Sequence, residues 1–375
     1  MARSRSPCIL NSYRYNLMLS TRASLVFSAA SIACYSCAPP LEGQAATRPG
    51  PSIPVFELDK TWPKALPNGW ALGPISGVSV DSRDHVWMLH RSNREKAGKG
   101  PLAPPVIEFD PDGNLVRAWG TSNPGYAWPI QEHGLRVDSD GNVWVTGNTE
   151  GDVGTILKFS PDGKPLLQIG KQDGPTEKPL NNDPSVLGKL PADLFADVPS
   201  KELFVADGER GSRRVIVFDI ESGAFKRLWG AYGEKPDEGA APVYDAGSPA
   251  SRTFSAAVHC VQIAKDGLVY VCDRGNDRIQ VFQKNGKFVR EAFVERQTKS
   301  PGSTASIAFS PDERYLYVGD GVNQRVWIFR RNSLEVVGSF PVAHNLHAIA
   351  VDSKGNIYAA EVAGERLEKF TPVKP

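Results

Sequence analysis

The sequence predicts an all-β fold, a six-bladed β-propeller, from three observations. A segment of alternating apolar and polar residues recurs six times, most copies hold four strand-like runs, and a spare strand-like run precedes the first copy. Alternation indicates half-buried strands, and a repeated unit of this size indicates a ring or a stack of small sheets. Closing the ring would remove the open sheet edges, so we expect a propeller.

Each copy opens with a short apolar run followed by a tight turn and an aromatic-rich strand. The turns read D-S-D-G, K-D-G or S-K-G in the clearest copies, where Gly or Asp accepts the positive φ that such a turn needs. A third run then ends in phenylalanine, as in RVIVF and RIQVF. The first residues of the six copies are Ser76, His133, Ala192, His259, Ala305 and His347.

The sixth copy lacks a fourth strand, because the sequence stops at Pro375. A matching run, PVFELDK at residues 54–60, stands ahead of the first copy. Pairing this run with the last copy would complete the sixth blade and close the ring. The alternative, an array of β-sandwiches, needs no strand from the opposite terminus. No long amphipathic helix with start and stop signals is visible in residues 47–375, which we assign to the propeller.

Residues 1–46 differ in kind and are predicted to be a signal peptide with its following segment. Four arginines precede an apolar stretch at residues 23–38, and a segment rich in Ala, Gly and Pro follows. The apolar stretch is short for a membrane span. We therefore expect a secreted or periplasmic protein without a transmembrane segment. A lipid anchor at Cys34 is the minor alternative.

The charge balance excludes some partners. Lys and Arg number 43 against 42 Asp and Glu, and the basic residues are interleaved with acids, so no basic stripe for nucleic acid exists. We expect a monomer that takes a small molecule or peptide. Of the five cysteines, Cys260 and Cys272 flank one K-D-G turn at equal distance. Either a cross-strand disulfide or two buried thiols would suit that position.

Three of the six histidines, His133, His259 and His347, begin alternate copies of the repeat. In a closed ring they would point at one axis from directions about 120° apart. Three neutral imidazoles with an open fourth position form the catalytic zinc pattern. The alternative is a water-filled channel that histidines merely line. The other histidines, His85, His90 and His344, do not share the phase, and we expect structural or peripheral roles for them.

Two arginines, Arg91 and Arg274, follow the second strands of opposite copies and are expected on the same face as the histidines. Each could bind a carboxylate through two hydrogen bonds. A salt bridge to a neighbouring aspartate is the alternative, above all for Arg274 beside Asp273 and Asp277. Long connections should rim this face at residues 92–104, 121–132, 171–189 and 231–255. Their candidate contacts are Tyr126, Tyr232, Tyr244 and Asp245, whereas the opposite face looks featureless.

The repeats resemble NHL repeats, and several motifs resemble peptidyl-α-hydroxyglycine α-amidating lyase. These motifs are H-G-L-x-V-D-x-x-G-N-x-W-V-T, H-R, A-D-G and D-R-x-N-x-R-I-Q-V-F, spread over roughly residues 76–370. The resemblance implies a six-bladed propeller that binds zinc through three histidines and splits a hydroxyglycine-extended peptide into an amide and glyoxylate. It assigns the zinc to His133, His259 and His347. It also implies that Arg91 contacts the substrate carboxylate or the hydroxyl-bearing carbon, and Arg274 falls on an arginine of the pattern.

Two positions depart from that family. A catalytic tyrosine follows its A-D-G motif, but Glu209 follows Gly208 here. A calcium-binding aspartate follows its last zinc histidine, but Ala348 stands here. The replacement base is therefore Glu209 or a tyrosine of residues 231–255, and calcium is a weak expectation.

Three functions follow in order of preference. The first is an exported zinc-dependent lyase-like enzyme acting on an α-hydroxyglycine-type carbinol, with Arg91, Glu209 and Arg274 as catalytic candidates. The second is a non-catalytic NHL propeller that binds a peptide, protein or cell-wall ligand. The third is a hydrolase of the gluconolactonase type, whose cation is held by carboxylates and asparagine instead of histidines.

Overall fold

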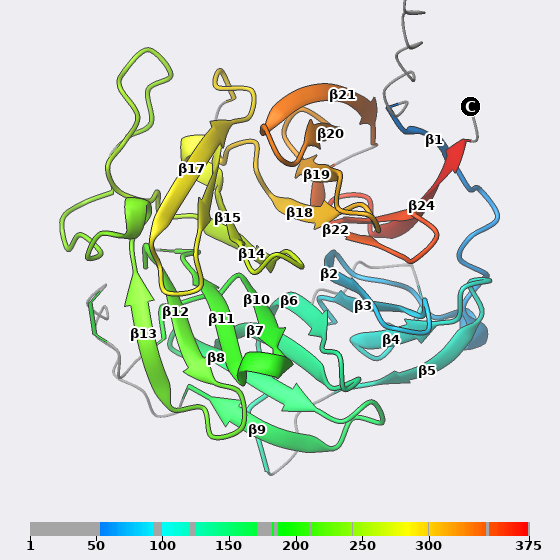
Figure 1. Cartoon of the computed structure of the whole chain (residues 1–375). Coiled ribbons are helices and arrows are strands. Elements are labelled where there is room, and N and C mark those ends of the chain that lie inside the picture. The colour runs from blue at the N-terminus through cyan, green and yellow to red at the C-terminus, as the bar shows by residue number, and fades with distance from the viewer. Residues whose placement is uncertain are drawn as a thin grey trace, which may run out of the picture. The chain divides into compact units, whose positions relative to one another are not determined.

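The computed structural model describes residues 53–373, except 93–99, 121–124, 171–181, 184–186, 211, 242, 299 and 343–344. Chain contacts divide the protein into Met1–Gly50 and Pro51–Pro375, and all described residues lie in the second unit. The described residues form six four-stranded antiparallel sheets arranged as blades around a centre (Figure 1). The predicted six-bladed propeller is confirmed. The expected signal peptide, residues 1–46, lies outside the described residues.

Each of the first three blades uses four consecutive strands. Blade 1 holds β2 (Ile75–Val80), β3 (Val86–His90), β4 (Val106–Phe109) and β5 (Leu115–Trp119). Blade 2 holds β6 (Gln131–Val137), β7 (Val143–Thr149), β8 (Val153–Phe159) and β9 (Pro165–Ile169). Blade 3 holds β10 (Asp193–Asp197), β11 (Glu202–Asp207), β12 (Arg214–Asp219) and β13 (Phe225–Trp229).

Blades 4 and 5 continue this pattern, and blade 6 combines the two ends of the fold. Blade 4 holds β14 (Val258–Ile263), β15 (Val269–Asp273), β16 (Arg278–Phe282) and β17 (Phe288–Phe293). Blade 5 holds β18 (Ser306–Phe309), β19 (Tyr315–Asp320), β20 (Arg325–Arg330) and β21 (Glu335–Pro341). Blade 6 holds β22 (Leu346–Val351), β23 (Ile357–Glu361), β24 (Arg366–Val373) and β1 (Val55–Leu58). Within the described part of the chain, 3₁₀ turns lie at Pro67–Gly69, Val198–Ser200, Ala231–Gly233 and Arg274–Asn276.

The first strands of the blades line the centre of the ring. Each of β2, β6, β10, β14, β18 and β22 contacts the first strands of both neighbouring blades, and β2 contacts β22 to complete the circle (Figure 1). Apolar side chains fill the space between adjacent blades, as Trp144 and Ile156 of blade 2 do with Leu203 and Val205 of blade 3. Burial of these faces against one another stabilises the ring.

The N-terminal strand closes the ring as predicted. Strand β1 pairs antiparallel with β24, with Leu58 opposite Phe370. The ring of Phe56 then packs on the rings of Tyr317 and Phe340 in blade 5, with centroids 5.6 and 4.8 Å away. Blade 6 therefore joins residues from both ends of the propeller.

The same hydrogen bond occurs within three of the blades and fixes the turn after the first strand. An aspartate at the end of that strand accepts from an indole N–H or a phenol O–H six residues later. The turn and the buried aromatic strand are thereby tied together. The pairs are Asp81 with Trp87, Asp138 with Trp144 and Asp352 with Tyr358, at 3.1, 2.9 and 3.1 Å.

Cys260 and Cys272 form a disulfide, the first of the two arrangements that the sequence allowed. They lie directly opposite each other on β14 and β15, and their Cα atoms are 4.8 Å apart. The bridge covalently closes the hairpin that carries His259.

We expect the double variant Cys260→Ser/Cys272→Ser to be less stable than the oxidised protein by roughly 2 kcal/mol, because the open hairpin regains chain entropy on unfolding. Its midpoint of thermal unfolding should fall by a few degrees. Calorimetry of the oxidised protein, the reduced protein and the variant checks this. Equal midpoints for all three would show that the bridge does not contribute.

Candidate metal centre and active site

The three histidines that begin alternate repeats, His133, His259 and His347, lie at β-bulges near the start of their strands. In each of β6, β14 and β22 the pairing with the second strand shifts register at the histidine. Such β-bulges re-aim a side chain that regular pleating would direct between blades. The shifts fall between Glu132 and Leu135, Val258 and Cys260, and Leu346 and Ala348.

Each histidine is anchored to the following blade by its Nδ1 atom. The partners are backbone carbonyls of the residues that begin the next repeat: Ala192, Ala305 and Ser76 bind His133, His259 and His347 at 2.8, 2.5 and 2.7 Å. A carbonyl oxygen only accepts, so Nδ1 carries the proton and Nε2 keeps its lone pair. Anchoring of this kind orients metal-binding imidazoles.

The three imidazoles converge in the ring. Their centroids are 4.7, 4.8 and 5.1 Å apart, and one ligating nitrogen of each lies within 4.8 Å of the others. The Nε2 atom of His259 is buried and has no hydrogen-bond partner among the described residues. A buried polar atom without a partner is costly, and a cation would satisfy it. The donor set therefore fits a zinc ion.

The surroundings keep these histidines neutral. Burial, helped by the charge of Arg91, lowers the pKa of His133 to about 3. Burial also holds the pKa values of His259 and His347 well below their usual range, with nearby positive charges acting in the same direction. Metal binding requires the neutral imidazole, so the site needs no deprotonation step at neutral pH.

Arg91 and Arg274 lie at the ends of β3 and β15, in opposite blades, as predicted. Arg91 is buried, and its Nε donates to the backbone carbonyl of Glu132 at 3.1 Å. Asp273 does not pair with Arg274, because it binds Arg278 at 2.8 Å instead. The positive charges of Arg91 and Arg274 both lower the histidine pKa values, so both cations lie within electrostatic reach of the triad.

Glu209 is the acidic group beside the triad. One of its carboxylate oxygens lies 4.0 Å from Nε2 of His259 and has no hydrogen-bond partner among the described residues. Burial raises the pKa of Glu209, and the charges of Arg274, Arg210 and Arg91 oppose this shift. Sequence reasoning missed Arg210, which adjoins Glu209 and adds a third positive charge near the triad.

Gly208 allows Glu209 to approach the neighbouring blade. A Cβ atom at this position would lie 2.3 Å from the Cβ of Val258. Because Val258 directly precedes His259, the missing side chain brings the end of β11 against the start of β14. The A-D-G sequence therefore has a packing reason in addition to any catalytic one.

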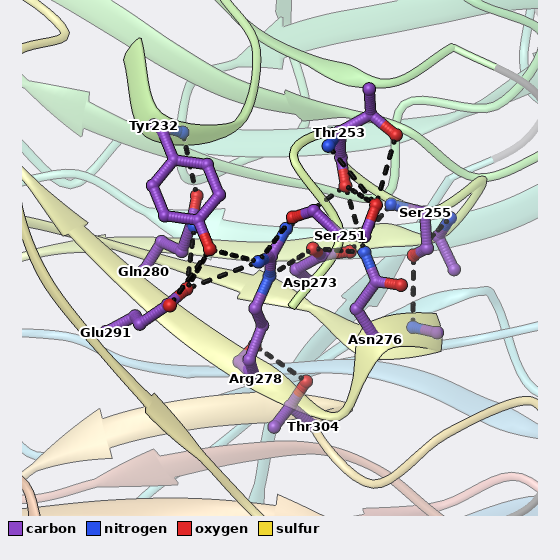
Figure 2. A network of polar contacts seen from close by, with 12 residues as sticks. Tyr232, Ser251, Thr253, Ser255, Asp273, Asn276, Arg278, Gln280, Glu291 and Thr304 are labelled. Carbon is purple, nitrogen blue, oxygen red and sulfur yellow. Dashed lines mark hydrogen bonds and ion pairs between the residues drawn. The ribbon is translucent and has the colours of Figure 1, made fainter. Parts of the chain in front are cut away.

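The tyrosines of the long connections do not reach the triad. Figure 2 shows Tyr232, from the turn after β13, against Glu291 and Arg278 of blade 4: its hydroxyl donates to Glu291 at 2.9 Å and accepts from Arg278 at 2.9 Å. Tyr244 donates to the carbonyl of Arg296, and Asp245 caps its own turn by accepting from Gly247. These residues hold the loop against blade 4, so neither tyrosine is placed as the replacement base.

Tyr126 is also used in packing. Its ring lies against Trp128 and Phe159 of blade 2, with centroids 6.4 and 5.2 Å away. The tyrosines of these long connections thus hold the connections in place by packing and hydrogen bonding, a role that composition alone does not reveal.

The out-of-phase histidines have structural partners. His90 is buried, accepts from the Gly73 amide and bonds the Pro104 carbonyl, and burial lowers its pKa to about 4. His85 bonds Glu108 at 2.7 Å. Asp81, His85 and Glu108 lie close enough to hold a metal, but Arg83 already bridges the two acids. His344 lies outside the described residues.

The face opposite the long connections is not featureless. A cavity of about 450 Å³ opens there between the first strands of the blades. Half-buried apolar residues from all six blades line it: Val80, Val137, Phe195, Ile263, Phe309 and Val351. A second cavity of about 20 Å³ lies directly against His259 and His347. Alternation patterns identified these residues as strand positions but could not show the space between blades.

The fold and the site define a class: a six-bladed propeller of NHL-type repeats with three converging histidines on its axis, two of them buried and the third half-buried. Residues 135–373 match the family model described as "Lactonase, 7-bladed beta-propeller". The chain belongs to this propeller family, although its own described residues form six blades. The match begins inside β6, so it covers most of the ring but not blade 1.

Two curated relatives are similar in sequence along most of this chain. NHL repeat-containing protein 3 of Mus musculus is 27% identical over 336 residues, covering 85% of each chain. Peptidyl-alpha-hydroxyglycine alpha-amidating lyase 1 of Drosophila melanogaster is 26% identical over 352 residues, covering 84% of this chain and 59% of the relative. The resemblance to NHL proteins and amidating lyases is confirmed.

A solved structure of a streptogramin B lyase superposes with a TM-score of 0.51 and 12% identity, covering 85% of this chain and 98% of that one. At this identity the match shows the fold alone. No helix among the described residues is long and apolar enough to cross a membrane.

Proposed function

We propose that this protein is an exported zinc-dependent lyase that cleaves an α-hydroxyglycine-type carbinol into an amide and glyoxylate. The observation that carries the proposal is the histidine triad, whose Nδ1 atoms are all tethered to carbonyls and whose Nε2 lone pairs remain available. The relatedness to amidating lyases supports the same reaction class.

The residues around the triad suit an anionic carbinol. A zinc ion bound by the three histidines would supply Lewis-acid polarisation of the substrate hydroxyl. Arg91 and Arg274 would bind the substrate carboxylate. Glu209 would accept the hydroxyl proton, the new carbonyl of glyoxylate would form as the C–N bond breaks, and Glu209 would return the proton to the amide nitrogen.

The test is turnover by the zinc-loaded full chain. We expect N-benzoyl-α-hydroxyglycine to yield benzamide and glyoxylate, measured by chromatography, and the apoprotein to yield neither until zinc is restored. A protein that binds zinc tightly but releases no glyoxylate from this or an unprotected peptide substrate would contradict the lyase.

Three specific observations favour two other functions. The absence of a tyrosine after Gly208 and the similarity to NHL repeat-containing protein 3 favour a non-catalytic propeller that binds a peptide, protein or cell-wall ligand. The family match favours lactone hydrolysis. Acid release from glucono-δ-lactone, measured in the same preparation, tests for lactone hydrolysis. Against that function, imidazoles stand here where a gluconolactonase-type site would use carboxylates.

We expect Arg91→Met to raise KM for the carboxylate substrate by roughly 10- to 100-fold, the effect of losing a charge-assisted hydrogen bond. Steady-state kinetics check this, with zinc content as a folding control. A substrate analogue with a carboxamide in place of the carboxylate should be turned over equally by the variant and the unmodified protein. Equal losses for both substrates would show that Arg91 does not recognise the anion.

Export is part of this proposal. It is supported by the leader-like residues 1–46 and by the Cys260–Cys272 disulfide, since disulfides persist mainly in oxidising compartments. N-terminal sequencing of protein recovered from fractionated cells tests it: an intact residue 1 in a cytosolic fraction would contradict export.

A further inference from the structure

Arg136 lies on the axis side of blade 2, three residues after His133, and is surrounded by acceptors. Its Nε and Nη2 donate to the two carboxylate oxygens of Asp193 at 2.9 and 2.7 Å. With its carbonyl turned toward the guanidinium, Gln262 accepts from Nη1 and Nη2 at 2.7 and 2.6 Å. The Arg136 and Asp193 side chains are only 13% and 10% exposed.

Arg136 lies between two cavities of the ring. The cavity of about 20 Å³ is lined by His259, His347, Arg136 and Asp193. The cavity of about 450 Å³ begins on the other side, where Arg136 and Gln262 line it. Among the described residues, Arg136 is the one that lines both. The Arg136 side chain therefore lies between the cavity against the triad and the larger cavity below it.

The same contacts join the blades that carry two of the histidines. Asp193 follows Ala192, whose carbonyl holds Nδ1 of His133. Asp193 also accepts from the Val261 amide at 3.4 Å, and Val261 is two residues after His259. Arg136 thus links the first strands of blades 2, 3 and 4 directly beneath the triad.

The residues at this level do not fit the calcium ion that the family resemblance implies. Ala348 offers no side-chain oxygen, and both oxygens of Asp193 are engaged by Arg136. Calcium takes six to eight oxygen ligands, and a cavity of about 20 Å³, which holds roughly one water molecule, leaves no room for water to supply the missing ones. The positive guanidinium would also repel a second cation.

We infer that the guanidinium of Arg136 is a fixed positive charge on the axis of this propeller, which we call the axial cation. It takes the place of a calcium ion and positions His133 and His259. Its replacement of calcium between the two cavities stands independently of the reaction; its positioning of ligands rests on the proposed zinc site.

The test of the axial cation uses the zinc-loaded full chain and its thermal unfolding. We expect no stoichiometric calcium by elemental analysis and no rise in the unfolding midpoint with millimolar calcium chloride. Arg136→Met should lower the midpoint by about 5 °C or more, because a nearly buried carboxylate loses its cationic partner. The double variant Arg136→Met/Asp193→Asn should recover part of that loss. The exposed pair of Arg314 and Asp312, at 2.6 Å, provides the control variant Arg314→Met, which should leave the midpoint unchanged.

Stoichiometric calcium in the unmodified protein, or a midpoint for Arg136→Met equal to that of Arg314→Met, would overturn the axial cation. The positioning role has its own readout: in Arg136→Met, zinc affinity should fall about 10- to 100-fold and the visible spectrum of the cobalt-substituted protein should change. Arg136→Lys should retain zinc affinity and the cobalt spectrum only in part, because lysine cannot bind Asp193 through a fork of two donors. Unchanged affinity and spectrum would refute positioning. A protein that binds no zinc at all would sink the proposed function and leave the calcium and stability results standing.

Discussion

His259→Ala should abolish zinc binding, taking the metal content from about one ion per chain to a small fraction of that. The remaining two imidazoles cannot complete a stable three-nitrogen site, and the described acid beside His259 is Glu209, 4.0 Å from its Nε2 atom, which is not a nitrogen ligand. With the metal absent, kcat/KM should fall by at least about 100- to 1000-fold, the equivalent of several kcal/mol of Lewis-acid stabilisation.

Elemental analysis and single-turnover kinetics of the purified variant provide the measurement. His85→Ala is the matched control, because His85 bonds Glu108 away from the triad and should leave zinc content unchanged. Circular dichroism with an unaltered β spectrum excludes loss of the fold. Full zinc content in a folded His259→Ala protein would remove the basis of the metal centre.

Glu209→Gln should lower kcat by about 100- to 10,000-fold while leaving zinc content at the level of the unmodified protein. The substitution keeps the shape of the side chain but removes its ability to accept a proton, and the oxygen nearest His259 lies 4.0 Å from Nε2. KM should change little, because Arg91 and Arg274, and not Glu209, are proposed to bind the substrate carboxylate.

Glu221→Gln is the matched control, since Glu221 is exposed and pairs only with Lys201 at 3.0 Å among the ion pairs of the described residues. Two results would redirect the interpretation. Loss of zinc from Glu209→Gln would make Glu209 a metal ligand, and unchanged kcat would return the search for a base to other side chains near the triad.

Much of the architecture was predictable because its determinants are local. The alternation of apolar and polar residues identified the strands, and the missing fourth strand of the sixth copy indicated closure by residues 54–60. Pairing of β1 with β24 confirms this. His133, His259 and His347 occupy the same position in alternate repeats, and this predicted that they would converge. In a closed ring, equivalent positions of the blades lie at equal distances from one axis, and the three side chains do lie together.

The tyrosines show where this reasoning stopped. Tyr232 and Tyr244 occur in a long connection of the expected face, yet they bind residues of blade 4 and its loops. Their role depends on how the connection folds back on itself, which no periodicity encodes. Arg136 was missed for a similar reason: its position in β6 looks like an ordinary polar residue of an alternating strand.

By itself, the sequence determined the repeat, the ring closure and the phase of the three histidines, because each is set by residue type and spacing along the chain. The tertiary structure decided the rest. It tethered each Nδ1 to a carbonyl of the next blade, brought Glu209 to His259 across Gly208, and placed Arg136 against Asp193 below the triad. These contacts join residues of different blades, so they arise only from the packing of one sheet against the next.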